Sequence, residues 1–213
     1  VSCWLKRHEP ACFLAALLNS QPMGFYPPAQ LVYDARRHGI EVRPADVMTS
    51  EWACTLEKRG SEPNFAKLPS PANSLLPKLG SDPLFCDPLF CPEQPAVRLG
   101  LNRVSGLKET TAIRIVAARI ESAFTSTEDL ALRAALDAGD LKALASADAL
   151  AALSGHRRQQ VWDASALKPA PPLLRSAPVD EDLLTLPPAS EGEEVVFDYA
   201  ATGLTLRRHP LQL

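Results

Sequence analysis

The chain has 213 residues, 46% of them hydrophobic, and a formal net charge of −3 at pH 7. This length and apolar content suffice for one large or two small domains with ordinary cores. The longest apolar run, residues 13–18, is far below the roughly 18 residues of a membrane span, which excludes a transmembrane segment. The net charge excludes a uniformly basic surface, so contact with a polyanion must come from a local basic segment.

The five cysteines, at positions 3, 12, 54, 86 and 91, show no paired CxxC spacing. An odd number without such spacing is typical of free thiols, and no secretion signal is visible at the start, so we expect a reducing, cytoplasmic location. Residues 82–91 are a direct duplication of Asp-Pro-Leu-Phe-Cys. A zinc site there would need two further ligands, so we interpret it as an accidental tandem repeat and expect no bound metal.

Fourteen of the twenty prolines lie in two stretches, residues 63–95 and 169–188. Such composition predicts connections between compact pieces, with a disordered insertion at about 58–95 and a linker at 168–190. Residues 178–198 carry seven acidic side chains and no Lys or Arg. We interpret their carboxylates as a solvated acidic linker, because two-metal catalysis needs carboxylates held rigidly on packed elements.

Two amphipathic helices are predicted near the start. The first begins at Pro10 and carries an apolar stripe made of Phe13, Leu14, Leu17 and Leu18. After a break at residues 19–24, the second begins at the proline pair 27–28 and ends before Gly39.

Short strands follow these helices. Residues 40–42 predict a brief extended piece, which Pro44 ends. Alternation at residues 52–56 and again at 97–101 predicts two half-buried strands that pair as a hairpin.

Four short helices are predicted between residues 109 and 167. The first has an apolar stripe of Ile113, Val116, Ala117, Ile120 and Phe124. Ser126 and Asp140 are the expected caps of the next two helices, and the fourth covers residues 156–167. We therefore predict a mainly α fold with a short β-hairpin and long proline-rich loops.

The sequence VSGLK at residues 104–108 predicts a turn that offers free backbone N–H groups to a phosphate. Glycine at position 106 lets the chain bend and lets a ligand approach the main chain. The candidate phosphate contacts are Arg103, Ser105, Gly106, Lys108 and Arg114. An ordinary loop between a strand and a helix would have the same pattern, and the surrounding positive charge favours the binding interpretation.

A second basic corner, Arg157 and Arg158, follows Gly155. We keep it as a candidate DNA contact, although a solvated helix start would look the same. The four histidines are far apart in sequence, and no serine or cysteine has a recognisable nucleophile setting. We therefore assign no catalytic residue and no metal ligand to this chain.

Several blocks of the sequence resemble the C-family bacterial DNA polymerases, the family of the replicative polymerase III alpha subunit. WLKRHEPACFLAALLNS at residues 4–20 and HGIEVRPADV at 38–47 are similar to blocks of the fingers region. RLGLNRVSGL at 98–107 resembles the start of the family's helix-hairpin-helix region. NSQPMGFY at 19–26 is similar to the corresponding block of the family's error-prone branch. GLTLRRHPL at 203–211 resembles the segment that precedes the family's OB-fold domain.

The resemblance implies a domain order that begins with the C-terminal part of the fingers in residues 1–48 and strands interrupted by the insertion in 49–101. A helix-hairpin-helix DNA-binding domain in 102–167, the linker in 168–190 and a segment in 191–213 leading toward an OB fold follow. Lys108 stands where the family often has a second hairpin glycine. The second hairpin, near residues 147–149, lacks glycine altogether.

The resemblance also implies a function, namely that the chain is part of an error-prone DNA-directed DNA polymerase acting in translesion synthesis. The palm domain with the catalytic carboxylates and their Mg²⁺ would lie outside this chain. The implied partners are primed duplex DNA and deoxynucleotides, together with other mutagenesis proteins and the sliding clamp. A non-catalytic DNA-binding module and a truncated, inactive polymerase remnant are the alternatives.

Overall fold

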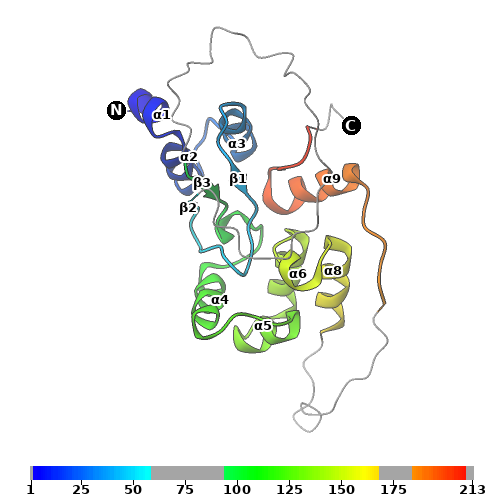
Figure 1. Cartoon of the computed structure of the whole chain (residues 1–213). Helices are drawn as coiled ribbons and strands as arrows, with labels where there is room; N and C mark the ends of the chain where they lie inside the picture. The colour runs from blue at the N-terminus through cyan, green and yellow to red at the C-terminus, as the bar shows by residue number, and fades with distance from the viewer. Residues whose placement is uncertain (1, 59–93, 168–183, 210–213) are drawn as a thin grey trace.

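A computed structural model of the chain describes residues 2–58, 94–167 and 184–209 (Figure 1). The duplicated cysteine motif, nearly all of the predicted insertion, most of the predicted linker and the last residues of the polymerase-like C-terminal motif lie outside the described residues. Cys3, Cys12 and Cys54, which lie within them, are free thiols.

The first part of the chain forms the N-terminal helical group, made of α1 (Ser2–His8), α2 (Pro10–Asn19) and α3 (Pro28–Arg37). Helix α2 begins at a proline and buries Leu14 and Leu18, as predicted. Helix α3 buries Val32 and ends before Gly39, whose φ of 81° is readily adopted only by glycine. Both predicted helices are therefore confirmed.

A small three-stranded sheet follows, made of β1 (Val42–Arg43), β2 (Thr55–Glu57) and β3 (Ala96–Arg98), in the order β1-β3-β2. Strand β2 runs antiparallel to β3, with Leu56 opposite Val97, which confirms the predicted pairing. The predicted extended piece near residue 42 adds to the other edge of β3 as a parallel strand, so Val97 also has Val42 as a neighbour.

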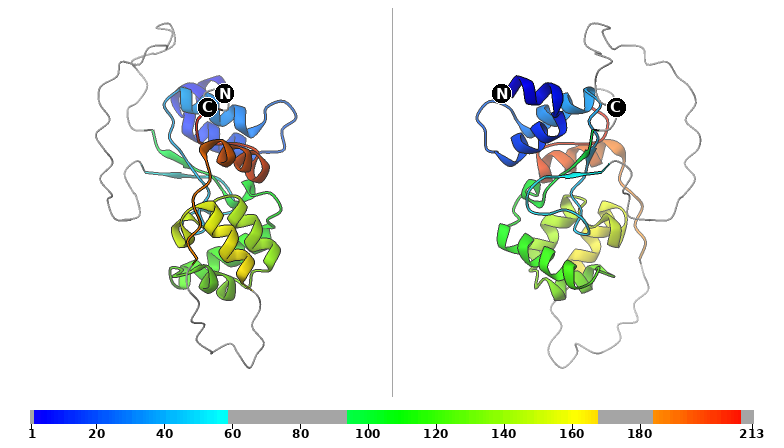
Figure 2. Two further views of the ribbon diagram at one scale, coloured as in Figure 1. Left: turned by 90° about the vertical axis from the view of Figure 1, so that its right-hand side faces the viewer. Right: turned by 60° about the vertical axis from the view of Figure 1, so that its left-hand side comes forward.

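After the 3₁₀ turn η1 (Leu101–Arg103), the chain forms the central helical group. Its helices are α4 (Glu109–Glu121), α5 (Thr127–Arg133), α6 (Ala138–Ser146), α7 (Ala151–Ser154) and α8 (Arg157–Ala166). Figure 2 shows this group at one end of the molecule and the N-terminal helical group at the other, with the sheet and α9 (Glu191–Thr202) between them. The chain is mainly helical, as predicted.

The predicted inward face of α4 is wrong. Ile113 and Ile120 are 57% and 79% exposed, whereas Thr111, Ala112, Ile115 and Ala118 are buried. The Thr111 hydroxyl donates a hydrogen bond to the carboxylate of Asp140 on α6, 3.2 Å away. The smaller face is thus turned inward, with Thr111 bonded to α6 and the Ala118 carbonyl accepting from Arg133 of α5.

One predicted helix cap is confirmed and the other is wrong. The Ser126 hydroxyl accepts a hydrogen bond from the Asp129 N–H and begins α5 as expected. Helix α6 begins one turn earlier than predicted, because Asp137 caps it by accepting the N–H of Asp140. Asp140 is freed from the capping role and points inward to Thr111.

The acidic residues 191–194 are not part of a solvated linker, which corrects the sequence interpretation. They form the first turn of α9, where negative charge suits the positive end of the helix dipole. Ser190 and Glu193 form a reciprocal capping box, and Gly203 ends the helix in a left-handed conformation. Glu194 is buried, so part of this acidic segment belongs to the packed structure.

Candidate nucleic-acid interface

The turn at residues 104–108 presents open main chain to solvent. Gly106 is exposed and has φ of 85°, a left-handed conformation that other residues rarely adopt. A Cβ atom added at Gly106 would meet no atom within 4 Å, so the space beside its backbone is empty. Buried Val104 and Leu107 anchor the turn on either side.

The backbone N–H groups of this turn divide into two sets. Those of Ser105 and Leu107 donate to the carbonyls of Ala201 and Val104, at 2.8 and 3.3 Å, and hold the turn in place. Among the described residues, no acceptor is paired with the N–H of Gly106 or with those of residues 108–110, which begin α4. The N–H groups of residues 108–110, the N-cap and first two residues of α4, therefore lie at the positive end of a helix dipole, and that of Gly106 lies in the turn just before it. Free donors at a helix start favour an anion.

The nearby cations are not equally available to a ligand. Lys108 is exposed and forms no ion pair with any described residue. The Arg103 side chain is half-buried and its Nε donates to Asn102, 3.3 Å away. Arg114 is occupied, since it donates to the Ala135 carbonyl at 2.6 Å and lies 3.6 Å from the carboxylate of Asp140.

The second basic corner is engaged with α9. Arg157 has a side chain only 5% exposed, and its guanidinium pairs with Glu194 at 3.1 Å and with Asp198. Arg158 is partly exposed and pairs with Glu193, 3.1 Å away. The structure thus places Arg157 inside the protein, and Arg158 shares its charge with a carboxylate.

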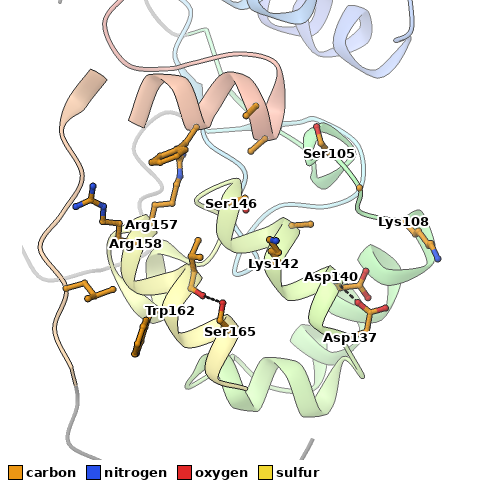
Figure 3. Close-up of a pocket in the computed structure, with 18 residues that line it drawn as sticks. Ser105, Lys108, Asp137, Asp140, Lys142, Ser146, Arg157, Arg158, Trp162 and Ser165 are labelled. Atoms are coloured by element: carbon orange, nitrogen blue, oxygen red, sulfur yellow. Dashed lines mark hydrogen bonds between the residues drawn. The ribbon is translucent and has the colours of Figure 1, made fainter. Parts of the chain in front are cut away.

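Both corners line one cavity of about 880 Å³ between α6, α8 and α9. Figure 3 shows Ser105 and Lys108 at one end of it and Arg157 and Arg158 at the other. Lys142 on α6 lies between these ends. Arg103 and Arg114 do not line the cavity, so the structure brings together five of the seven predicted residues. Lys142 was missed because a lone lysine on a helix gives no sequence signal.

The second hairpin differs from the first in its hydrogen bonding. The N–H groups of residues 147–149 donate to carbonyls of α6, and that of Leu150 donates to the Gln160 side chain, 3.2 Å away. Asp148 supplies the positive φ, 60°, that glycine would otherwise provide. Burial raises the pKa of its carboxyl against the attraction of Arg157. This turn has its amides satisfied internally and offers none to a phosphate.

Across residues 2–58, 94–167 and 184–209, no group of three or more His, Cys, Asp or Glu side chains is placed to hold a metal ion. None of the helices in these ranges has the length and apolar character needed to cross a bilayer.

Comparison with known proteins gives relatives along the entire chain. This chain is 47% identical over 212 residues to a protein of Azoarcus sp. (strain BH72) and 47% identical over 213 residues to a protein of Methylococcus capsulatus. It is 49% identical over 213 residues to a third, of Burkholderia pseudomallei. All three are named error-prone DNA polymerase, and 100% of this chain is covered each time. These matches confirm the resemblance drawn from the sequence blocks.

The chain spans only 18%, 19% and 17% of the lengths of these three relatives. A family model described as "Helix-hairpin-helix motif" matches residues 39–160. This match runs from the start of the sheet region to α8 and includes the turn with Gly106. Because it covers more than half of the sequence, the chain belongs to the helix-hairpin-helix family.

Proposed function

We propose that this chain is a segment of an error-prone DNA-directed DNA polymerase, in which the turn at residues 104–108 binds the phosphates of duplex DNA. The observation that carries the proposal is the exposed Gly106, three residues before α4, whose N–H has no acceptor among the described residues and whose Cα has empty space beside it. Free amides at a helix start suit a phosphate oxygen, since they supply donors and partial positive charge together.

Binding of this kind holds the DNA backbone without reading its sequence. Lys108 adds a full charge beside the free amides, while Ser105 contributes a hydroxyl and Arg103 a second cation at the edge of the turn. Arg114 has a smaller role, because its donors already serve Ala135 and Asp140. We place Arg158 and Lys142 at the periphery and leave out Arg157, whose charge is used internally.

Within the longer polymerase, residues 1–48 would complete the fingers and residues 102–167 would hold duplex behind the active site. The described residues offer no cluster that fits Mg²⁺, so no step of nucleotide transfer is assigned to them. Deoxynucleotides, the sliding clamp and other mutagenesis proteins would be partners of the longer protein, acting in the cytoplasm. This division of labour stays a prediction.

The first test replaces the exposed lysine of the turn. Lys108→Gln should weaken binding to a primed duplex and lower the slope of log affinity against log salt by about 1, as expected for one lost phosphate contact. Fluorescence anisotropy at several salt concentrations measures both. Lys6→Gln is the matched control, because Lys6 lies on α1, far from the turn in sequence, and pairs with Asp34.

The second test concerns the glycine. Gly106→Ala and Gly39→Ala place a Cβ at positive φ in equally open positions, so each should lower the free energy of unfolding by about 1–2 kcal/mol. Only the change at position 106 should also reduce duplex affinity, because only there are the amides offered to a phosphate. Equal affinity for both variants, or wild-type salt dependence for Lys108→Gln, would contradict the proposal.

A further inference from the structure

A second cleft, of about 780 Å³, lies between α3, α9 and the segment that follows α9. The segment after α9 turns back beside α3 (Figure 1), and the Arg36 guanidinium donates to the Leu206 carbonyl, 2.7 Å away. This contact joins residues 170 positions apart in sequence and fixes one wall of the cleft.

Two tyrosines line this cleft with much of their surface in solvent. Tyr33 on α3 is 51% exposed and Tyr199 on α9 is 40% exposed. The Tyr33 ring lies 6.0 Å from the His209 ring, at an interplanar angle of 58°. The Arg37 guanidinium is 5.9 Å from the centre of the same ring. The cleft therefore offers two partly exposed aromatic rings, one of which, Tyr33, has a guanidinium over it.

The charge of the lining is strongly positive. It contains Arg36, Arg37, Arg207 and Arg208 and one carboxylate, Glu191.

Arg208 pairs with Glu191. Arg207 lies 3.1 Å from Glu194, the buried α9 carboxylate that also pairs with Arg157. Arg36 and Arg37 have no carboxylate partner within the described parts of the chain. The Arg37 guanidinium thus lies over the Tyr33 ring, and Arg36, which donates to the Leu206 carbonyl, brings a second charge without a carboxylate partner among the described residues to the same cleft.

We propose that this cleft binds single-stranded DNA, with unpaired bases stacking on Tyr33 and Tyr199 while Arg36 and Arg37 contact the phosphates. Exposed aromatic rings beside cations are the combination that holds single strands without sequence preference. A duplex fits the site poorly, since its base faces are covered by neighbouring base pairs.

The position of α9 supports a role distinct from that of the Gly106 turn. Phe197 and Ala201 face the cavity next to that turn, whereas Tyr199 faces the second cleft. Residues two positions apart on a helix point to nearly opposite sides, so one helix separates the two surfaces. The unpaired strand beyond a duplex would therefore meet a different set of side chains from the duplex itself.

The experiment measures anisotropy of a labelled oligothymidine of about 12 nucleotides with the full 213-residue chain. Tyr33→Leu and Tyr199→Leu keep apolar bulk but remove the ring, and each should weaken binding about tenfold, within the range for loss of one stacked base. Tyr33→Phe should bind like the wild type, because the stacking face remains. Tyr26→Leu, which changes an exposed tyrosine outside the cleft, is the matched control.

Charge is tested separately with Arg36→Gln combined with Arg37→Gln, which should lower the salt slope of oligothymidine binding while duplex affinity is retained. Lys108→Gln should do the reverse, so failure of this proposal is distinguishable from failure of the duplex site. Oligothymidine affinity that is unchanged by both leucine variants overturns the proposal. The proposal is also overturned if inorganic polyphosphate competes as strongly as unlabelled oligothymidine. The cleft would then recognise negative charge alone, which would suit an acidic protein partner.

Discussion

Arg157 and Arg158 are adjacent residues with the same charge and very different environments. The Arg157 side chain is 5% exposed and lies between Glu194 and Asp198, and it also donates to the Glu194 carbonyl at 3.0 Å. The Arg158 side chain is 39% exposed and pairs with Glu193 at the surface. The first arginine neutralises buried carboxylates, whereas the second forms a surface ion pair whose attraction water largely screens.

This contrast predicts unequal costs of removal. Arg157→Ala should lower the free energy of unfolding by about 3–5 kcal/mol, because two enclosed carboxylates lose their buried counter-charge and keep only that of Arg207, whose side chain is 37% exposed. Arg158→Ala should cost at most about 1 kcal/mol. Urea denaturation of the two variants checks the difference, and each serves as the control for the other. Similar losses for both would mean that the Arg157 pairs contribute no more than surface contacts.

The candidate site could be predicted only in part from its residues. The turn at Gly106 was found because glycine followed by a helix start is a local pattern, and its backbone is exposed as that pattern requires. Which cations stay available depends on distant groups that folding brings near. Arg114 meets the carbonyl of Ala135 and Arg157 meets acids more than 35 residues away, and no local spacing reports either contact.

At the scale of elements, one carboxylate connects all three strands of the sheet. Glu57 on β2 lies 2.8 Å from Arg98 on β3 and 2.9 Å from Arg43 on β1. Burial alone would raise the pKa of the Glu57 carboxyl, but its hydrogen bonds and attraction to Arg98, then Arg43, outweigh burial. The pKa therefore lies below its ordinary value of 4.5.

The lowered pKa predicts how stability depends on pH. A carboxyl with a depressed folded-state pKa stabilises the fold fully above its ordinary value, and this contribution is lost as the pH falls through the depressed pKa. Glu57→Gln should therefore cost about 1.5–3 kcal/mol near pH 7, and the difference from wild type should shrink below pH 4.5. Unfolding curves recorded across this range measure it. Glu128→Gln, at an exposed position on α5, reports the effect of net charge alone, and a gap that persists in acid would refute the assignment.

Helix α4 shows why the buried side of a helix is harder to predict than the helix itself. Its length and position followed from helical spacing, but it has apolar residues on more than one side. The larger isoleucines suggested one inward face, whereas the buried side is the one with Thr111, Ala112 and Ala118, which meets α6 at Thr111 and α5 at Ala118. Periodicity identifies an amphipathic helix, and tertiary contacts then decide which side is buried.

For the whole molecule, α9 and the segment after it connect the two helical groups. The Ser105 N–H donates to Ala201 at the end of α9, Arg157 pairs with acids of the same helix, and Arg36 donates to Leu206 beyond it. Sequence reasoning treated the acids at the start of α9 as solvated, because their partners lie on the far side of a proline-rich stretch. The mainly α fold class and most of the helices were predictable from the sequence. The packing of α9 and the segment after it against both helical groups was not.

Removal of residues 168–213 should therefore affect both stability and DNA binding. The truncated chain should lose at least the roughly 3–5 kcal/mol of the Arg157 pairs in its free energy of unfolding. Its duplex affinity should fall as well, because the Gly106 turn loses the hydrogen bond from Ser105 to Ala201 that fixes it. Chemical denaturation and anisotropy measure the two effects, and a synthetic peptide of residues 184–209 added in trans should restore both. If the truncated chain bound duplex as tightly as the full chain, the turn would be held by the central helical group alone, and α9 would have no part in positioning it.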